Sequence, residues 1–235
     1  MSYERQTRGD ASRLKRWVQH RRLADAIRLT RLAPQPSHIV DYGAGDGAFS
    51  LTLASIYPGA QITCFEPVPA MREEALRLVA GHPRITIADN EALIASGADL
   101  VVCTEVFEHL PPAEFQRALD EIERISRPSG LIVLGVPVET GPPAFAKGLF
   151  RMVRRYGEED AQPSRVLAAT RGRPPQRSAQ PVSDGRAYFH AHLGFDHRAF
   201  ERAIRARFMV QERRFSPWNL GSWFASELYL AVRPR

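Results

Sequence analysis

A glycine-rich turn constrains the fold of this chain more than any other feature. It reads Asp41-Tyr42-Gly43-Ala44-Gly45-Asp46-Gly47, and it lies between the apolar run 38–40 and a helical pattern that reaches residue 56. Glycine adopts backbone angles that are closed to other residues and lets a ligand lie against the main chain. Such a turn between a strand and a helix predicts a nucleotide-binding type of α/β sheet with a cofactor at the turn.

Apolar runs and helical patterns alternate along most of the chain. The runs are continuous, as expected for strands that helices cover on both faces, so we expect a doubly wound, Rossmann-like sheet. The expected strands are 38–42, 61–65, 84–88, 99–104, 131–136, 208–215 and 223–232. The expected helices are 46–56, 68–80, 91–96, 112–127 and 196–207.

The chain length predicts a single domain over residues 1–235 with four parts. Residues 1–34 form a basic cap with an amphipathic helix over 11–32, and residues 35–137 form the cofactor-binding core. Residues 138–190 are an insertion rich in Pro and Arg, which we expect to be a partly mobile substrate cap with a short helix over 145–156. Residues 191–235 supply the closing helix and strands.

The composition indicates the cellular environment and the kinds of partner to expect for this protein. No apolar run is long enough to cross a membrane, and the polar N-terminus lacks the apolar region of a secretory signal. Cys64 and Cys103 lie in apolar strands, which predicts two buried reduced thiols in a cytoplasmic protein. The net charge of +6 is uneven, since residues 33–140 hold six basic against fifteen acidic residues. The basic flanks indicate either attraction to an anionic partner or an arginine-rich solvated surface.

The acidic residues of the turn indicate which cofactor binds there. Asp41 and Asp46 would repel a pyrophosphate, and no Lys or Arg lies in the turn to compensate. S-adenosylmethionine has no phosphate and carries a sulfonium and an ammonium, which carboxylates favour. Glu66 follows the next strand, where a carboxylate meets the ribose hydroxyls of an adenosine ligand. Because the glycines also fit a loose dinucleotide pattern, an NAD-dependent oxidoreductase remains an alternative.

Five motifs in order resemble those of class I S-adenosylmethionine-dependent methyltransferases. They are the glycine turn, Glu66-Pro67, Asp89-Asn90, the segment 99–110 and the segment 127–132. The resemblance implies a seven-stranded sheet that is parallel except for an antiparallel last strand, with an insertion before the last helix. It also implies S-adenosylmethionine as cofactor and S-adenosylhomocysteine as product. The implied cofactor contacts are Asp41, Tyr42, Gly43, Ala44, Gly45, Gly47, Glu66, Pro67, Met71, Asp89, Asn90, Thr104 and Glu105.

The acceptor half of the resemblance is closest to small-molecule and glycan methyltransferases, such as the O-methyltransferases of the ubiquinone pathway. We therefore expect methyl transfer to a hydroxyl, and less readily to an amine or a carboxyl, by in-line displacement. The expected acceptor is a small molecule or glycan, which is anionic in one interpretation. We expect no nucleic-acid partner. The sequence does not predict the oligomeric state. A hydroxyl acceptor usually needs a base. The candidates are Glu105, Glu108, His109, His190, His192 and His197.

Among these candidates we assign catalysis to His109, Glu108 and His192, and we place His197 on the first turn of the last helix. The spacing Glu105-x-x-Glu108-His109 resembles a metal-binding pattern found in some ubiquinone-pathway and RNA 2′-O-methyltransferases. We expect no metal, and the alternative ligand set is Glu105, Glu108, His109 and His192. A metal-assisted RNA 2′-O-methyltransferase and a non-enzymatic binder of adenosyl ligands therefore stay open as alternatives.

Overall fold

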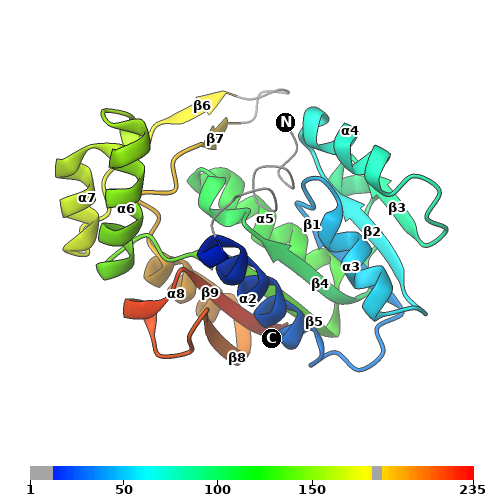
Figure 1. Cartoon of the computed structure of the whole chain (residues 1–235). Helices are drawn as coiled ribbons and strands as arrows, with labels where there is room; N and C mark the ends of the chain where they lie inside the picture. The colour runs from blue at the N-terminus through cyan, green and yellow to red at the C-terminus, as the bar shows by residue number, and fades with distance from the viewer. Residues whose placement is uncertain (1–12, 182–186) are drawn as a thin grey trace.

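A computed structural model describes residues 13–181 and 187–235 of the chain (Figure 1). Its strands are β1 (His38–Tyr42), β2 (Gln61–Phe65), β3 (Ile85–Ala88), β4 (Ala98–Thr104), β5 (Ser126–Pro137), β6 (Ala179–Pro181), β7 (Ala187–Phe189), β8 (Phe208–Ser216) and β9 (Glu227–Pro234). Its α-helices are α2 (Arg13–Thr30), α3 (Ala48–Ile56), α4 (Pro69–Leu78), α5 (Pro112–Ile125), α6 (Pro142–Arg155), α7 (Pro163–Thr170) and α8 (His197–Arg207). Short 3₁₀ turns are η1 (Glu91–Leu93), η2 (Phe107–His109), η3 (Glu159–Ala161) and η5 (Ser222–Phe224).

Seven strands form one sheet in the order β3-β2-β1-β4-β5-β9-β8. The first five are parallel, whereas β9 runs antiparallel to both of its neighbours. The predicted doubly wound sheet with an antiparallel last strand is therefore confirmed. Parallel strands bring their carboxyl ends to the same edge, which is where such sheets bind ligands.

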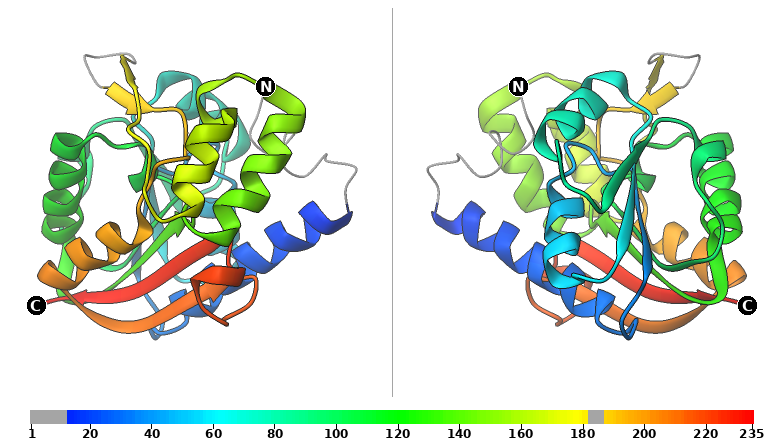
Figure 2. Two further views of the ribbon diagram at one scale, coloured as in Figure 1. Left: turned by 90° about the vertical axis from the view of Figure 1, so that its left-hand side faces the viewer. Right: turned by 90° about the vertical axis from the view of Figure 1, so that its right-hand side faces the viewer.

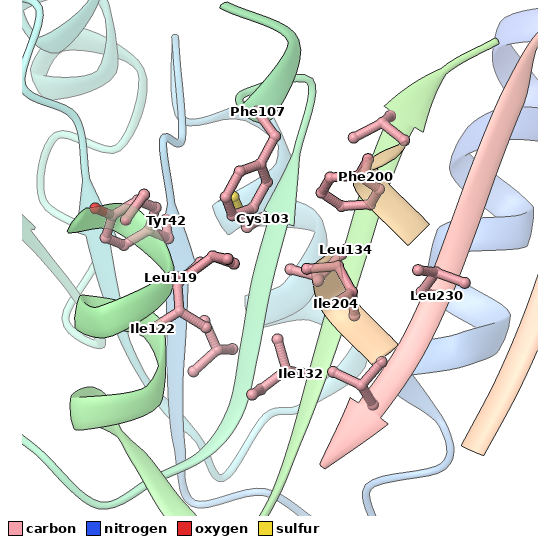
Figure 3. Close-up of a cluster of buried hydrophobic side chains, with 14 of the residues drawn as sticks. Tyr42, Cys103, Phe107, Leu119, Ile122, Ile132, Leu134, Phe200, Ile204 and Leu230 are labelled. Atoms are coloured by element: carbon pink, nitrogen blue, oxygen red, sulfur yellow. The ribbon is translucent and has the colours of Figure 1, made fainter. Parts of the chain in front are cut away.

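Helices cover both faces of this sheet. Helices α2, α3 and α4 pack on one face, where Leu29 and Leu53 meet Ile39. Helices α5 and α8 pack on the other face, where Leu119 and Ile204 meet the strands (Figure 3). Successive residues of a strand point to opposite faces, so both sides of the central strands are apolar.

The insertion between β5 and α8 forms a small layer of its own (Figure 2). Helix α7 packs against α6 around Ala144, Val166 and Ala169. Gly148 permits this approach, because a Cβ there would lie 2.4 Å from Val166 Cγ1. The sequence predicted a partly mobile insertion over 138–190 with one short helix, and the structure shows a second helix, α7, whose apolar side packs on α6. Residues 182–186 lie outside the described part of the chain.

Three local predictions differ from the structure. The strand expected over 131–136 begins earlier, because α5 ends at Ile125 and β5 starts at Ser126. The helix expected over 91–96 is the three-residue turn η1, because Ile94 is buried and the Arg124 side chain bonds the carbonyls of Glu91 and Ile94. The strand expected from residue 223 begins at Glu227, since η5 occupies the preceding residues. None of the described helices combines the length and the apolar composition that a bilayer span requires.

Candidate active site

The glycine turn crosses the carboxyl end of β1 beside the end of β2. The amides of Gly43 and Ala44 donate to the carbonyl of Phe65 at 2.8 and 2.9 Å. Gly43 has φ +77°, and a Cβ there would lie 2.4 Å from Val106 Cγ2. A side chain at this position would therefore be strained and would also collide with the segment after β4.

Asp41 is the penultimate residue of β1 and lies on the sheet face that α3 covers. Its carboxylate is buried and accepts a hydrogen bond from the Ser50 hydroxyl at 2.7 Å. Burial raises the pKa of Asp41 to about 7, and the nearby Glu66 adds to the rise. A cationic ligand at the turn would favour the ionised form of this carboxyl.

Glu66 follows β2 and faces the same turn. Its Oε2 accepts from the amide of Gly45 at 2.8 Å, and its Oε1 accepts from the amide of Val68 at 2.8 Å. These bonds orient a buried carboxylate between the turn and the start of α4. The Met71 methyl lies on the same side, 3.5 Å from the Cβ position of Gly45. An acid and an apolar side chain therefore both lie beside Gly45 of the turn.

The other predicted cofactor residues fall into three groups. Asp89 and Asn90 are exposed after β3, and Asn90 caps η1 by accepting from the amide of Ala92. The Tyr42 side chain points into the core instead, where its ring lies 4.8 Å from Phe65. In the third group, Ala44 packs on α4 and Gly47 with φ +80° lets α4 approach the turn, whereas the carbonyl of Pro67 accepts from Arg72 and Thr104 packs beside Gly135 of β5.

Glu105 begins the acceptor side of the site, directly after β4. It has φ +58°, a left-handed conformation that is costly for a residue with a side chain. Its carboxylate binds the Arg22 guanidinium of α2, which also lies 3.1 Å from Glu227 Oε1 of β9. Burial opposes ionisation of Glu105, but Arg22 and the bond to Glu227 hold its pKa at about 2. Burial raises the pKa of Glu227 well above its ordinary value.

His109 is fixed in one tautomer by the insertion. Its Nδ1 lies 2.8 Å from the carbonyl oxygen of Phe189 in β7. A carbonyl only accepts hydrogen bonds, so Nδ1 carries the proton and Nε2 keeps a lone pair. Burial lowers the pKa of His109, which favours this neutral form.

The free Nε2 of His109 faces a buried carboxyl and a second imidazole. Glu108 is fully buried, and its Oε1 lies 4.0 Å from His109 Nε2. Neither carboxyl oxygen of Glu108 has a hydrogen-bond partner among the described residues, and burial raises its pKa well above the ordinary value. The rings of His109 and His192 meet edge to face at 4.7 Å. Burial and His109 lower the pKa of His192 to about 4.

The structure thus brings the three predicted catalytic residues together. One ligand atom from each of Glu108, His109 and His192 lies within 4.8 Å of the others, a spacing that suits a metal ion. Glu105, the fourth member of the alternative ligand set, is engaged with Arg22. His197 starts α8 as predicted and lies 3.2 Å from the Thr140 hydroxyl, whereas His190 is exposed.

Several residues near the site were not foreseen. Arg177 binds the main-chain carbonyl of Glu108 and lies over the Phe189 ring at 4.1 Å, so it joins η2 to the insertion. Lys147 and Arg151 of α6 bind the buried Glu139. The sequence marked these cations only as part of a basic flank. Their i, i+4 spacing within the apolar helix α6 was the one local signal of an inward-facing pair.

Comparison with known proteins agrees with this geometry. Residues 40–134 match the model of a methyltransferase domain family. The chain is 37% identical over 130 residues to a malonyl-[acyl-carrier protein] O-methyltransferase of Geobacter sulfurreducens, a match that covers 51% of this chain and 43% of that protein. It is 30% identical over 101 residues to an uncharacterised methyltransferase of Oceanobacillus iheyensis, with 41% and 45% covered. The chain spans about half the length of the curated relatives it matches.

Solved structures show the same fold over almost the whole chain. The N-methyltransferase NodS of Bradyrhizobium japonicum, in complex with S-adenosylhomocysteine, superposes with a TM-score of 0.59 at 17% identity. That match covers 97% of this chain and 90% of NodS. Together these matches show that the chain is similar in sequence to methyltransferase domains over residues 40–134 and similar in fold to NodS over almost its whole length.

Proposed function

We propose that this protein transfers a methyl group from S-adenosylmethionine to a hydroxyl of a small molecule or glycan. The observation that carries this proposal is the free lone pair on His109 Nε2, which faces His192 and the buried Glu108. A neutral imidazole with a fixed tautomer is the group that a hydroxyl acceptor needs as its base.

The electrostatics of the turn support the cofactor. Asp41 and Glu66 bring two carboxylates to the place where the ligand would meet the backbone of Gly43 to Gly47. The negative potential of these carboxylates stabilises a bound sulfonium and ammonium, whereas it destabilises a bound pyrophosphate. NodS, which shares the fold, holds S-adenosylhomocysteine in its structure. We infer that the adenosyl ligand lies between the turn, Glu66 and Met71.

The donor is already activated, so the protein mainly aligns the acceptor and excludes water. The methyl carbon leaves the sulfonium sulfur and bonds to the acceptor oxygen, and the sulfonium becomes the thioether of S-adenosylhomocysteine. The hydroxyl proton passes to Nε2 of His109. Phe189 holds the ring through Nδ1, so the base keeps its orientation when it becomes protonated.

The test is a screen for S-adenosylhomocysteine release against pooled sugars, phenols, lipids and RNA, followed by kinetics on the best acceptor. We expect His109→Gln to lower kcat at least a hundredfold with little change in KM for S-adenosylmethionine. The exposed His190 is the matched control, and His190→Gln should keep kcat within about threefold. Equal activity of both variants would contradict a base at His109, and NAD binding without binding of S-adenosylhomocysteine would contradict the cofactor.

A second mode, metal-assisted transfer, is favoured by one further observation. Both oxygens of the fully buried Glu108 lack a hydrogen-bond partner within residues 13–181 and 187–235, and they face two imidazoles whose lowered pKa values favour the neutral form with a lone pair. One carboxylate and two imidazoles suit Mg²⁺, Mn²⁺ or Zn²⁺. An ion there would lower the pKa of a coordinated hydroxyl, and Glu108, His109 and His192 would hold the ion.

Calorimetric titration of the chelator-treated protein with Mn²⁺ and Zn²⁺ separates the two modes. Metal assistance predicts one site per chain that Glu108→Gln and His192→Ala both abolish, while His190→Gln leaves it intact. Methyl transfer that persists in chelator, with no measurable binding of either ion, would leave the metal-free base mechanism.

A further inference from the structure

Helix α6 directs two of its four cations, Lys147 and Arg151, inward, and it exposes several apolar side chains on its outer side. On the inner side, Lys147 Nζ and Arg151 Nη1 bind the buried Glu139 at 3.0 and 2.8 Å. On the outer side, Phe145, Leu149 and Val153 are 51%, 51% and 80% exposed. A helix that faces water has the opposite arrangement. The outer face of α6 is therefore typical of a surface that binds an apolar partner.

The segment around η5 extends this apolar face. Leu220, Trp223 and Phe224 are 74%, 65% and 60% exposed. Helix α6 packs against η5, and Lys147 Nζ also donates to the carbonyl of Ser226 at 3.0 Å. Figure 2 shows the two segments next to each other in its left view. We name this region the apolar rim, and it consists of Phe145, Leu149, Phe150, Val153, Trp17, Trp218, Leu220, Trp223 and Phe224.

All three tryptophans of the chain belong to the apolar rim. Trp17 of α2 stacks on Trp218 with ring centroids 5.6 Å apart, and the Arg21 side chain donates to the carbonyl of Pro217. Tryptophan is enriched where a membrane meets water, because its ring is apolar and its N–H is polar. Three exposed tryptophans on one side of a molecule fit that boundary.

The charges around the apolar rim are mainly basic. Helix α6 contains no acidic residue, and Asp25 is the only acidic residue of α2. Arg154 lies over the Phe150 ring at 4.9 Å, and Arg155 pairs with Glu158 at the end of α6. A second copy of this chain docked through a two-fold axis would place these arginines near each other. An anionic surface is the better complement to arginines beside aromatic rings.

We propose that the apolar rim is a docking surface for the interface of an anionic phospholipid bilayer. The aromatic and aliphatic side chains enter the boundary between headgroups and acyl chains, and the arginines bind lipid phosphates. This function is separate from methyl transfer and does not depend on it.

The test uses the full chain and two kinds of vesicle, phosphatidylcholine alone and phosphatidylcholine mixed with phosphatidylglycerol. Flotation should recover the protein with the anionic vesicles only. Tryptophan emission should shift to the blue on binding, and brominated lipids should quench it. The double variant F150E/V153E should weaken partitioning at least tenfold, because two carboxylates then face the lipid. Arg154→Gln should weaken it about fivefold, as expected for one cation near an anionic surface.

The matched control is Leu76→Glu, which places a carboxylate on α4 at the other end of the molecule (Figure 1). It should bind vesicles as the wild type does. Thermal melts that match the wild type show that each variant folds. The proposal is overturned if the folded wild type binds neither vesicle, or if F150E/V153E binds as well as the wild type. It is also overturned if light scattering shows a dimer that F150E/V153E dissociates, because the apolar rim would then join two copies.

Discussion

At the scale of single residues, Asp41 is the most informative group of the cofactor half. Its carboxyl is buried and accepts a hydrogen bond from the Ser50 hydroxyl, and burial raises its pKa to about 7. Below that pH the group is neutral. A cationic adenosyl ligand binds better to the ionised form, so binding at low pH must release a proton.

We therefore expect the affinity for S-adenosylmethionine, which carries the sulfonium charge, to rise as pH increases from about 6 to 8, by up to about tenfold per pH unit below the pKa. Asp41→Asn should bind more weakly and lose this dependence. The exposed Glu73 provides the control, since Glu73→Gln should keep the wild-type dependence. Isothermal titration calorimetry at several pH values measures both effects. A pH dependence that is unchanged in Asp41→Asn would show that another group carries it.

Gly43 gives a second prediction at this scale. An alanine there would have φ +77° and a Cβ within 2.4 Å of Val106. We expect Gly43→Ala to destabilise the fold by about 2 kcal/mol and to abolish ligand binding, because the turn must move. Gly59→Ala is the control, since nothing lies within 4 Å of that Cβ position. Denaturant unfolding measures the stability of both variants, and calorimetry measures their ligand binding. Equal stability and equal affinity of Gly43→Ala and Gly59→Ala would contradict this prediction.

At the scale of elements, a buried ion cluster attaches the insertion to the core. Glu139 follows β5, and Lys147 and Arg151 come from α6. Burial opposes ionisation of Glu139, but the two cations hold its pKa at about 2. A lowered pKa means that this group stabilises the fold above about pH 4.5, and that its contribution is lost as pH falls toward 2.

Glu139→Gln should cost about 3–5 kcal/mol, because it leaves two cations in a buried place without their carboxylate. The loss should be concentrated in α6 and α7, where amide hydrogen exchange should become faster than in β4. Glu73→Gln again serves as control, because its pair with Arg77 is exposed and a change of about 0.5 kcal/mol or less is expected. If Glu139→Gln accelerated amide exchange in α6, α7 and β4 to the same extent, the ion cluster would not be what attaches the insertion to the core.

At the scale of the whole molecule, Arg22 joins three parts of the chain. It extends from α2 to Glu105 after β4 and to Glu227 at the start of β9. Part of the positive charge that the sequence placed in the basic flanks is therefore neutralised by carboxylates inside the protein. The same is true of Lys147 and Arg151, which leaves fewer charges for an anionic partner than the sequence suggested.

Arg22→Met should bring the pKa of Glu105 up from about 2 and lower the free energy of unfolding at neutral pH by about 3 kcal/mol. The reason is that Glu105 and Glu227 then face each other without a cation. Arg28→Met tests the same change at an exposed position of the same helix and should be nearly neutral. Chemical denaturation at pH 5 and pH 8 measures both variants, and equal stability would contradict a role for Arg22 as a link.

The sheet, and the meeting of Asp41 and Glu66 at one of its edges, could be predicted from the sequence. Strand runs, the glycine turn and the acids Asp41 and Glu66 are local patterns, and parallel topology carries them to one edge without further information. The tertiary contacts alone show that Phe189 fixes the tautomer of His109, that Arg22 neutralises Glu105, and that Lys147 and Arg151 of α6 face the buried Glu139. The first two contacts join residues that are 80 and 83 positions apart, and local spacing carries no record of which distant group will satisfy a buried charge.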